Sequence, residues 1–312
     1  LTLNATNQDL LIQAGTLALN GQSLTVNGST GTLIVQNGGV LELQGAETIT
    51  ANGGNPQLQA GSTVRYMGAS GPYTLKTYSY QNLEIAGGTN TVFLMPGFLN
   101  IGANLTLTSG ILSLNGQNLT VTGTFENLAT LQLQGSETVT LTADTNSGTV
   151  EYVGNANGTG QSFTIKSWTY YTLSINMTDA ADSADSAISL DILGDFSLTS
   201  GAFTAPSTMN ITANFLHPSG TFSHNNGTVV LNGGNQTMSG STTFNHFTKS
   251  VAAASTLTFP AGATQTFLGT LTLNGASSQL LSLRSSTPGV QASIDPQSTR
   301  LLSFLDVQDN NN

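Results

Sequence analysis

The chain has 312 residues, of which 38% are hydrophobic and only 7% are charged, against about 25% charged residues in typical soluble domains. Six basic and sixteen acidic residues give a formal net charge of −10, so the chain lacks the Lys and Arg cluster that binding to nucleic acid or to an anionic membrane surface requires. It has no cysteine, which excludes a disulfide scaffold and a thiol nucleophile, and no apolar run long enough to predict a membrane-spanning helix.

The first sixty residues alternate apolar and polar side chains in very short segments. From residue 15 they read GTLALNGQ, SLTVNGST, GTLIVQNGG, VLELQG and AETITANGG. A two-residue period places one set of side chains inward and the other outward, as in a β-strand. The Gly and Asn residues that close each segment favour the positive φ angles of tight corners. We therefore expect strands of three to five residues separated by sharp turns.

Similar strands return at intervals that fit one coil of a solenoid. LAL at 17–19 recurs as LEL at 41–43, and LSL at 112–114 recurs as LQL at 131–133. These spacings fit three strands and three corners per coil, with each strand pairing in parallel ~4.8 Å from its counterpart. The sequence thus predicts an all-β, right-handed parallel β-helix of about 14 rungs and on the order of 70 Å long. A string of small β-sandwiches, with boundaries near residues 100 and 190, is the alternative.

A longer period lies over the first one. LNGQSLTV at 19–26 matches LNGQNLTV at 114–121, LQGAETIT at 43–50 matches LQGSETVT at 133–140, and VRYMG at 64–68 matches VEYVG at 150–154. TLKTYSYQNLEI at 74–85 likewise matches TIKSWTYYTLSI at 164–175. We interpret residues 1–312 as one continuous solenoid with degenerate modules at approximately 1–100, 101–190 and 191–268, and a partial module at 269–312.

The segment GTVEYVGNANGTGQSFTIKSWTYYTLSI at 148–175 resembles the repeat regions of large secreted bacterial surface proteins. The closing residues LTLNGASSQLLSLRSS and LLSFLDVQDNNN are similar to the ends of such modules. These regions are of the filamentous-haemagglutinin and autotransporter-passenger type, whose fold is a right-handed parallel β-helix. The resemblance implies an extracellular or cell-surface location and a non-enzymatic stalk, adhesin or fibre subunit.

The alternative function is a polysaccharide-processing β-helix, such as a lyase or a phage-type depolymerase. Such enzymes gather several carboxylates with Arg or Lys on one face of successive rungs. Here the acidic residues are scattered along the sequence, which favours the non-enzymatic interpretation. The acids in question are Glu42, Glu47, Glu84, Glu126 and Glu137.

Two of the six basic residues fall at equivalent positions in the repeat, each beside two aromatic residues. Alternation places Lys76, Tyr78 and Tyr80 on one side of their strand, and Lys166, Trp168 and Tyr170 on the same side of theirs. If that side faces outward, the rings form platforms for stacking on sugars, and surface glycans become candidate partners. If it faces inward, the aromatic residues seal a widened coil and the lysine stems cover apolar surface.

The one acidic cluster reads TDAADSADSAISLDILGD at 178–195, where a short helical turn is also plausible. Crowded carboxylates can supply the six to eight oxygens that Ca²⁺ takes, which makes Asp179, Asp182 and Asp185 the candidate metal ligands. The spacing matches no known calcium loop, so the favoured interpretation is a solvated insertion without a cofactor.

The chain begins LTLNATN, already in strand rhythm, and neither end shows an amphipathic capping helix. The end strands of a solenoid leave backbone groups unpaired unless another element covers them. We therefore expect either an excised fragment or a subunit, and the expected partners are neighbouring modules or copies stacked end to end.

Overall fold

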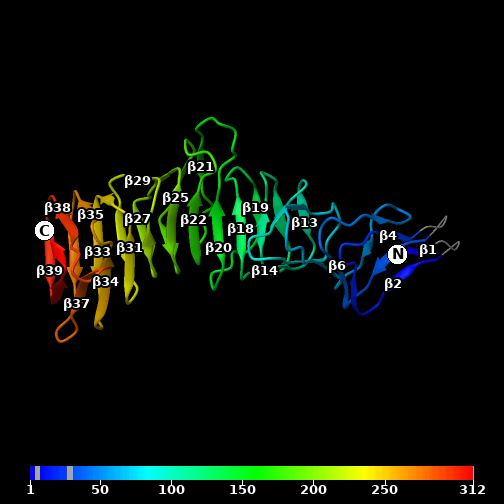
Figure 1. Ribbon diagram of the computed structural model, residues 1–312, viewed down its shortest axis with the longest axis horizontal. Helices are drawn as coiled ribbons and strands as arrows, with labels where there is room; N and C mark the ends of the chain where they lie inside the picture. The colour runs from blue at the N-terminus through cyan, green and yellow to red at the C-terminus, as the bar shows by residue number, and fades with distance from the viewer. Residues whose placement is uncertain (4–7, 27–30, 312) are drawn as a thin grey trace. The chain divides into compact units, whose positions relative to one another are not determined.

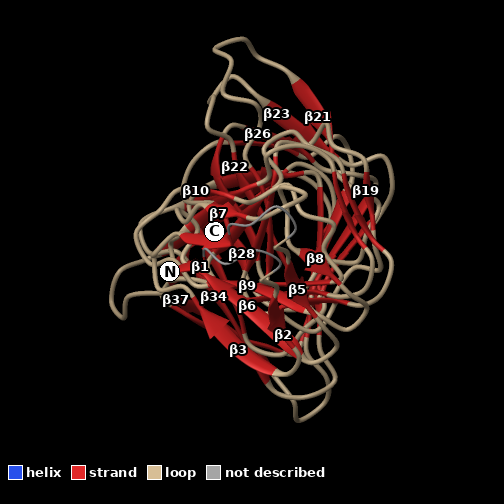
Figure 2. Cartoon of the chain, turned by 90° about the vertical axis from the view of Figure 1, so that its right-hand side faces the viewer, coloured by secondary structure: helices blue, strands red, loops and turns tan. Residues whose placement is uncertain are grey.

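The computed structural model describes residues 1–3, 8–26 and 31–311. All regular structure in these ranges is β-strand, and the strands stack in parallel as a β-solenoid of about 14 turns (Figures 1 and 2). The predicted fold class is confirmed, and the alternative of tandem sandwiches is wrong. The helical turn predicted in the acidic cluster is also wrong, because Ser183–Asp185 form a strand. The described part of the chain contains no helix long and apolar enough to cross a membrane.

The chain divides into two compact units. The first comprises Leu1–Leu133 and Glu137–Asp144, and the second comprises Gln134–Ser136 and Thr145–Asn312. Neighbouring strands within a sheet mostly differ by three in chain order, so one turn consists of three strands. The length of a turn varies, from 18 residues between Thr228 and His246 to 29 between Thr264 and Ser293. Loops at the corners therefore absorb the differences in length.

In the first unit, two three-stranded sheets begin the solenoid. One contains β1 (Thr2–Leu3), β4 (Leu24–Val26) and β7 (Ile49–Thr50), and the other contains β2 (Leu10–Ile12), β5 (Leu33–Val35) and β8 (Gln57–Leu58). A six-stranded sheet contains β3 (Gly15–Ala18), β6 (Gly39–Leu43), β9 (Thr63–Tyr66), β11 (Asn82–Ala86), β14 (Leu105–Ser109) and β17 (Phe125–Asn127). Two further sets are β10 (Tyr73–Thr74), β12 (Val92–Leu94), β15 (Ile111–Ser113) and β18 (Thr130–Leu133), and β13 (Leu99–Ile101), β16 (Leu119–Val121) and β19 (Val139–Thr140).

In the second unit, the longest run of paired strands is β20 (Thr149–Tyr152), β22 (Thr172–Asn176), β25 (Phe196–Ser200), β28 (Phe215–Leu216), β31 (Gln236–Ser239), β34 (Ser255–Phe259), β37 (Leu281–Ser285) and β40 (Leu305–Gln308). A second sheet contains β21 (Ser162–Thr164), β23 (Ser183–Asp185), β26 (Ala202–Thr204) and β29 (Thr221–Ser223). A third contains β24 (Leu190–Ile192), β27 (Thr208–Ile211), β30 (Thr228–Leu231), β33 (His246–Ser250), β36 (Leu271–Asn274) and β39 (Arg300–Ser303). The last contains β32 (Thr242–Phe244), β35 (Thr264–Phe267), β38 (Ala292–Pro296) and β41 (Asn310–Asn311).

The core follows from the alternation seen in the sequence. Strands such as β6 and β34 bury every second residue, and the large buried side chains are Leu41 and Leu43 in β6 and Leu257 and Phe259 in β34. Burying such side chains contributes ~25 cal/mol per Å² of apolar surface removed from water. The repeat also extends to an irregularity, because the register shifts after Ile85 in β11 and after Ile175 in β22. The two copies of the repeat are therefore structurally equivalent at these strands.

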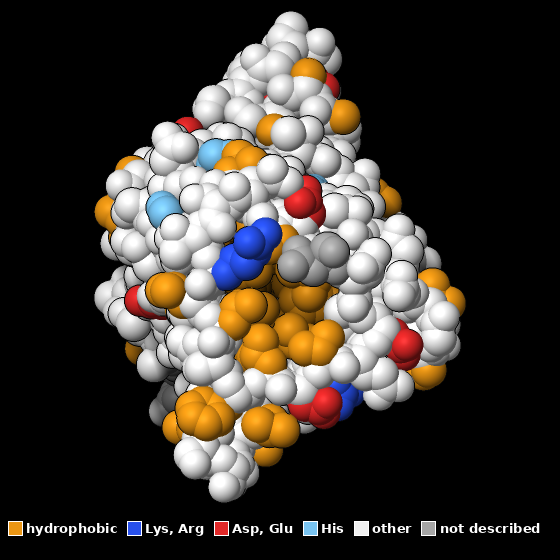
Figure 3. All heavy atoms as spheres, turned by 90° about the vertical axis from the view of Figure 1, so that its left-hand side faces the viewer, with side chains coloured by type: hydrophobic (Ala, Val, Ile, Leu, Met, Phe, Trp, Pro, Cys, Tyr) orange, Lys and Arg blue, Asp and Glu red, His pale blue; other side chains and the backbone are white. Residues whose placement is uncertain are grey.

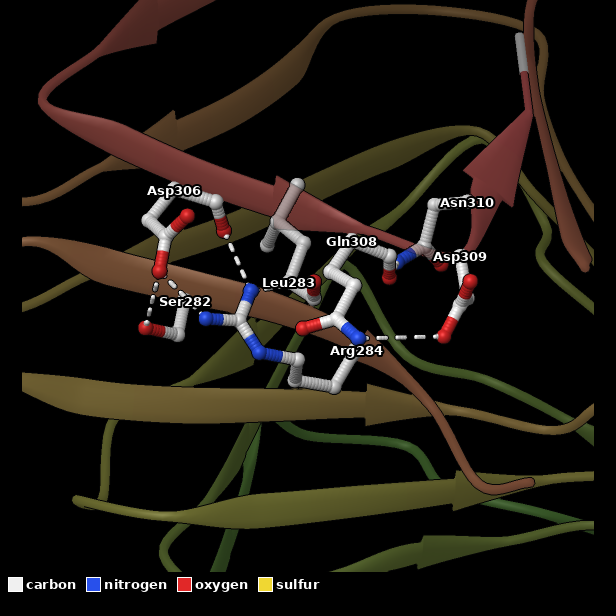
Figure 4. Close-up of polar contacts among 7 residues, drawn as sticks. All are labelled: Ser282, Leu283, Arg284, Asp306, Gln308, Asp309 and Asn310. Carbon is white, nitrogen blue, oxygen red and sulfur yellow. Dashed lines mark hydrogen bonds and ion pairs between the residues drawn. The ribbon is translucent and has the colours of Figure 1, made fainter. Parts of the chain in front are cut away.

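Apolar side chains gather in a hollow on the face seen in Figure 3, which belongs to the end of the chain that carries the C-terminus. The hollow measures about 130 Å³, and Leu273, Leu283, Leu302 and Val307 line it. Leu302 and Val307 are 50% and 52% exposed. Figure 4 shows the outer side of the same strands, where the Arg284 guanidinium pairs with the Asp306 carboxylate and donates to the Asp306 carbonyl oxygen at 2.9 Å. The last turns thus combine an exposed apolar core with a polar rim.

Candidate functional site

The repeated aromatic stretch forms a closed circuit of hydrogen bonds in the first unit. The backbone N–H of Lys76 donates to the Tyr66 hydroxyl at 2.9 Å, and the Tyr80 hydroxyl donates to the Lys76 carbonyl at 2.6 Å. The two hydroxyl oxygens lie 2.9 Å apart. Since the Tyr80 proton is used on the carbonyl, Tyr66 donates to Tyr80. Both tyrosines are buried, and burial raises their pKa well above the ordinary value.

The second unit repeats this circuit with equivalent residues. Lys166 N–H donates to the Tyr152 hydroxyl at 2.9 Å, Tyr170 donates to the Lys166 carbonyl at 2.5 Å, and the two hydroxyls lie 3.0 Å apart. Burial raises the pKa of Tyr170 as well. The sequence repeat VRYMG and VEYVG therefore belongs to the same structural unit as the aromatic stretch. A tyrosine on one strand clamps the corner that follows it.

The structure places two of the six candidate glycan-binding residues away from the surface. Tyr80 and Tyr170 are each 1% exposed and point into the core. Tyr78 is buried with a small exposed edge, while Lys76, Lys166 and Trp168 are half-buried. Residues 75–80 and 165–169 form no strand, so the strict alternation used for the prediction does not hold there. The inward interpretation accounts for the tyrosines, and binding of glycans by the other residues stays a prediction.

Two hollows lie on either side of Tyr78, and Thr77 and Tyr78 line both of them. The smaller, of about 170 Å³, is also lined by Lys76, Glu47 and Asn55. Burial and the negative charge of Glu47 raise the pKa of Tyr78 to about 12. This hollow holds one cationic and one anionic side chain and is thus polar in character.

The larger hollow, of about 340 Å³, carries no charged side chain in its lining. Its buried floor consists of Tyr78, Tyr80 and Leu99. Phe98 precedes β13 and is 62% exposed at the edge. The sequence prediction missed Phe98, although an aromatic residue directly after Pro96 and Gly97 and just before a strand interrupts the inward pattern of the neighbouring segments.

Glu47, which lines the smaller hollow, is 1% exposed. Its carboxylate accepts backbone N–H bonds from Gly21 at 2.9 Å, Gln44 at 2.6 Å and Gly45 at 2.7 Å. Burial acts to raise its pKa, but these donors outweigh burial and hold the pKa below the ordinary value. Glu137 accepts the N–H of Gly116 at 3.2 Å at the equivalent corner of the repeat. Both glutamates therefore link a corner to the preceding turn.

Not all of the acids are scattered in space. Register aligns Glu42, Arg65 and Glu84 on three successive strands of the six-stranded sheet. Arg65 Nε lies 2.7 Å from Glu84 Oε2, and Arg65 Nη1 lies 3.5 Å from Glu42 Oε2. The sequence interpretation missed this column, although LEL, VRY and LEI each carry the charged residue between two inward positions. Carboxylates beside an arginine on successive rungs are the feature that favours the alternative, enzymatic function.

The three aspartates of the acidic cluster bind separate groups of the protein. Asp182 is fully buried, and its carboxylate accepts the backbone N–H of Gln161 at 2.8 Å and of Asn155 at 3.3 Å. Asp185 accepts the Ser162 hydroxyl at 3.2 Å, and Asp179 accepts the N–H of Ala181 at 3.0 Å. In the described ranges no group of three His, Asp or Glu residues is arranged to hold a metal ion. Asp182 instead fastens the loop before β21, so the interpretation of the whole cluster as solvated is wrong at this residue.

One buried cation was not predicted. Lys249 occupies the second inward position of β33, where β11 and β22 have Ile85 and Ile175. It is 0% exposed, and its ammonium group donates to the carbonyl oxygens of Gly233 and Gly234, both at 2.6 Å, and to the Gln236 side chain. Burial lowers the pKa of Lys249 to about 8.

No protein-family model, no curated protein and no solved structure shows significant similarity to this chain.

Proposed function

We propose that this chain is a non-enzymatic structural and adhesive segment of a large secreted or cell-surface bacterial protein. The observation that carries the proposal is the use of the repeated Lys–aromatic stretch for architecture. Its tyrosines form hydrogen bonds that hold the corners in place. The repeat therefore serves to extend a regular stack.

The polar surface supports the same proposal. Only 7% of residues are charged, and Thr and Ser occupy 79 positions. Within each unit, a parallel stack of short strands offers a side surface for contact with other molecules. The expected partners are neighbouring modules or copies stacked end to end, for which the apolar hollow of Figure 3 supplies a surface.

Labelling of intact cells of the source organism tests the location. Antibodies against this chain should label cells that have not been permeabilised, and proteinase treatment of intact cells should remove the label. Label that appears only after permeabilisation would contradict the proposal.

The second candidate function is polysaccharide cleavage, and the Glu42–Arg65–Glu84 column favours it. Glycoside hydrolysis employs a pair of carboxyl groups. The ion pairs with Arg65 also give this column a structural role, since partly exposed pairs on adjacent rungs contribute up to about 1 kcal/mol each. We therefore rank cleavage second.

A screen for new reducing ends and for unsaturated uronate products, over neutral and acidic polysaccharides, separates the two functions. The structural proposal expects no turnover by the wild type. The enzymatic candidate expects turnover that Glu84→Gln abolishes and that Glu126→Gln, an exposed glutamate on β17 of the same sheet, leaves intact.

A further inference from the structure

The uncharged hollow beside β13 has the composition of a small-molecule site. Its floor is aromatic and apolar, and its rim consists of hydroxyl and amide groups from Thr77, Ser79, Gln81 and Asn100. At about 340 Å³ it reaches the lower end of the range of ligand sites, roughly 300–1,000 Å³. Few precisely placed polar groups over an apolar floor are typical of such sites.

Phe98 supplies the strongest argument for a ligand. Its side chain is 62% exposed at the edge of the hollow, so most of its ring is in contact with water. A ligand that covers this ring removes apolar surface from water, which favours binding. Exposed large aromatic residues that border a hollow are therefore more informative than isolated surface leucines.

The rim defines the chemistry of the ligand. Amide groups donate and accept hydrogen bonds, and hydroxyl groups do both as well. No cation or anion in the lining offsets the desolvation of a charged ligand, which would be costly. The ligand must therefore be neutral, with an apolar face for Phe98 and several hydroxyl or amide groups at its edge. A neutral sugar ring meets these requirements.

The second unit has different residues at the positions that line this hollow. Gly102 and Ala103 donate to the carbonyls of Tyr80 and Gln81, and Leu193 and Gly194 donate in the same way to Tyr170 and Tyr171. Leu193 thus stands where the first unit has Gly102. The same register places Asp191 opposite Asn100 and Ser189 opposite Phe98. The second unit thus has a leucine, a carboxylate and a serine where the first has the glycine, the amide and the phenylalanine, and its Leu193 is 42% exposed.

We propose that the hollow formed by Tyr78, Phe98, Asn100 and Gly102 binds one neutral sugar residue of a surface glycan. This inference rests on the adhesive part of the proposed function and assigns it to one site. Phe98 covers a face of the ring, and Asn100, Gln81 and Ser79 bind its hydroxyl groups.

Two variants test the site by different means. Phe98→Ala removes an exposed ring without touching the core. Gly102→Leu fills the hollow with the residue of the second unit, and the nearest atoms to the new Cβ belong to the flexible Gln81 side chain at 3.2 Å. Leu128→Ala, at a 53% exposed leucine of the same unit outside the hollow, is the control.

The wild type is applied to an array of neutral oligosaccharides, built from hexoses and N-acetylhexosamines, and of acidic ones built from uronic and sialic acids. The strongest neutral hit is then titrated by calorimetry. We expect binding to neutral glycans, about tenfold weaker binding by Phe98→Ala, loss of binding by Gly102→Leu, and no change in Leu128→Ala.

The inference would be overturned if the wild type bound no neutral glycan. It would also be overturned if Phe98→Ala and Gly102→Leu both bound as tightly as the wild type. In the latter case the adhesive function stands and the site lies elsewhere. Surface labelling of intact cells, which does not depend on this hollow, reports separately on the proposed function. Near-identical circular dichroism of the variants excludes loss of fold as the cause.

Discussion

Single hydroxyl groups hold the corners of this solenoid. The Tyr66 hydroxyl accepts a hydrogen bond from the Lys76 N–H and also contacts the Tyr80 hydroxyl. A circuit of this kind satisfies two backbone groups in a segment that forms no strand. Buried polar groups that lose a partner carry the full cost of desolvation, so the circuit is sensitive to the loss of any one of its members.

We expect Tyr66→Phe to lower the free energy of unfolding by about 1–3 kcal/mol, because it leaves the partly buried Lys76 N–H without this acceptor and removes the donor to the Tyr80 hydroxyl. Tyr73→Phe is the control, since its hydroxyl makes only a long contact of 3.3 Å with Ser70 at the surface. Urea unfolding of both variants measures the difference. Equal midpoints for Tyr66→Phe and Tyr73→Phe would contradict the role of the circuit.

Lys249 makes the free energy of unfolding depend on pH in the range above pH 8. The pKa of the buried ammonium is about 8, against 10.5 for an ordinary lysine. Between these values the unfolded chain binds a proton that the folded chain does not, so the free energy of unfolding rises with pH. Above about pH 10 the effect reverses, because tyrosines with raised pKa values, such as Tyr66, ionise first in the unfolded chain.

We therefore expect the urea midpoint of the wild type to increase from pH 7.5 to pH 9.5. Lys249→Met lacks the titrating ammonium group, so its urea midpoint should stay constant over the same pH range. The variant also leaves the carbonyls of Gly233 and Gly234 without the ammonium, so its midpoint should be lower at every pH. Parallel profiles for the two proteins would show that Lys249 does not titrate in this range.

At the scale of the element, glutamates at corners tie one turn to the next. Glu47 accepts three backbone N–H groups, one of which belongs to Gly21 of the preceding turn. Backbone donors at a corner have no strand partner, and a carboxylate satisfies several at once. The repeated sequence LQGAETIT and LQGSETVT thus encodes a corner with its own link.

Glu47→Gln should destabilise the protein by about 1–3 kcal/mol at pH 7, since the amide nitrogen faces N–H donors that the carboxylate satisfied. Because the folded pKa of Glu47 is lowered, its contribution is present above the unfolded value of 4.5 and is lost as pH falls through the folded value. The difference between wild type and variant should therefore shrink between pH 5 and pH 3.

Glu42→Gln is the control for this measurement, because Glu42 lies on the outer face and makes a single 3.5 Å ion pair. A partly exposed pair of this kind contributes less than about 1 kcal/mol. Equal losses of stability in the two variants at pH 7 would argue against a special role for the corner glutamate.

At the scale of the whole molecule, the strands near the C-terminus leave an apolar surface exposed. Leu301, Leu302, Phe304 and Val307 are each about half exposed, and Leu302 and Val307 line the hollow of Figure 3. Contiguous apolar surface on a soluble protein marks a site of interaction, and the backbone edges beside it can pair with another strand.

We expect the isolated chain to associate in a concentration-dependent manner in sedimentation velocity experiments, and Leu302→Lys to weaken this association. Leu128→Lys, at a 53% exposed leucine of the first unit, should leave it unchanged. A wild type that is monomeric at all concentrations tested, or two variants that behave alike, would contradict a role for this surface.

The sequence by itself determined the solenoid of short parallel strands. Short alternating segments, Gly and Asn at the corners and strands that return after about 20 residues predict parallel strands, because each of these features is local or strictly periodic. The repeat also indicated, correctly, that residues 74–85 and 164–175 are equivalent, and the matching circuits of Tyr66 with Tyr80 and Tyr152 with Tyr170 give the physical reason.

Only the tertiary structure decided which way side chains point at the corners and which charges meet. Tyr80 turns inward because the two-residue period applies within a strand, whereas residues 75–80 form none. Glu42, Arg65 and Glu84 meet because the register between rungs aligns them, and register depends on loop lengths that vary from turn to turn. The hollow beside Phe98 depends on the same packing, since a glycine in the sequence does not reveal whether a neighbouring rung fills the space above it.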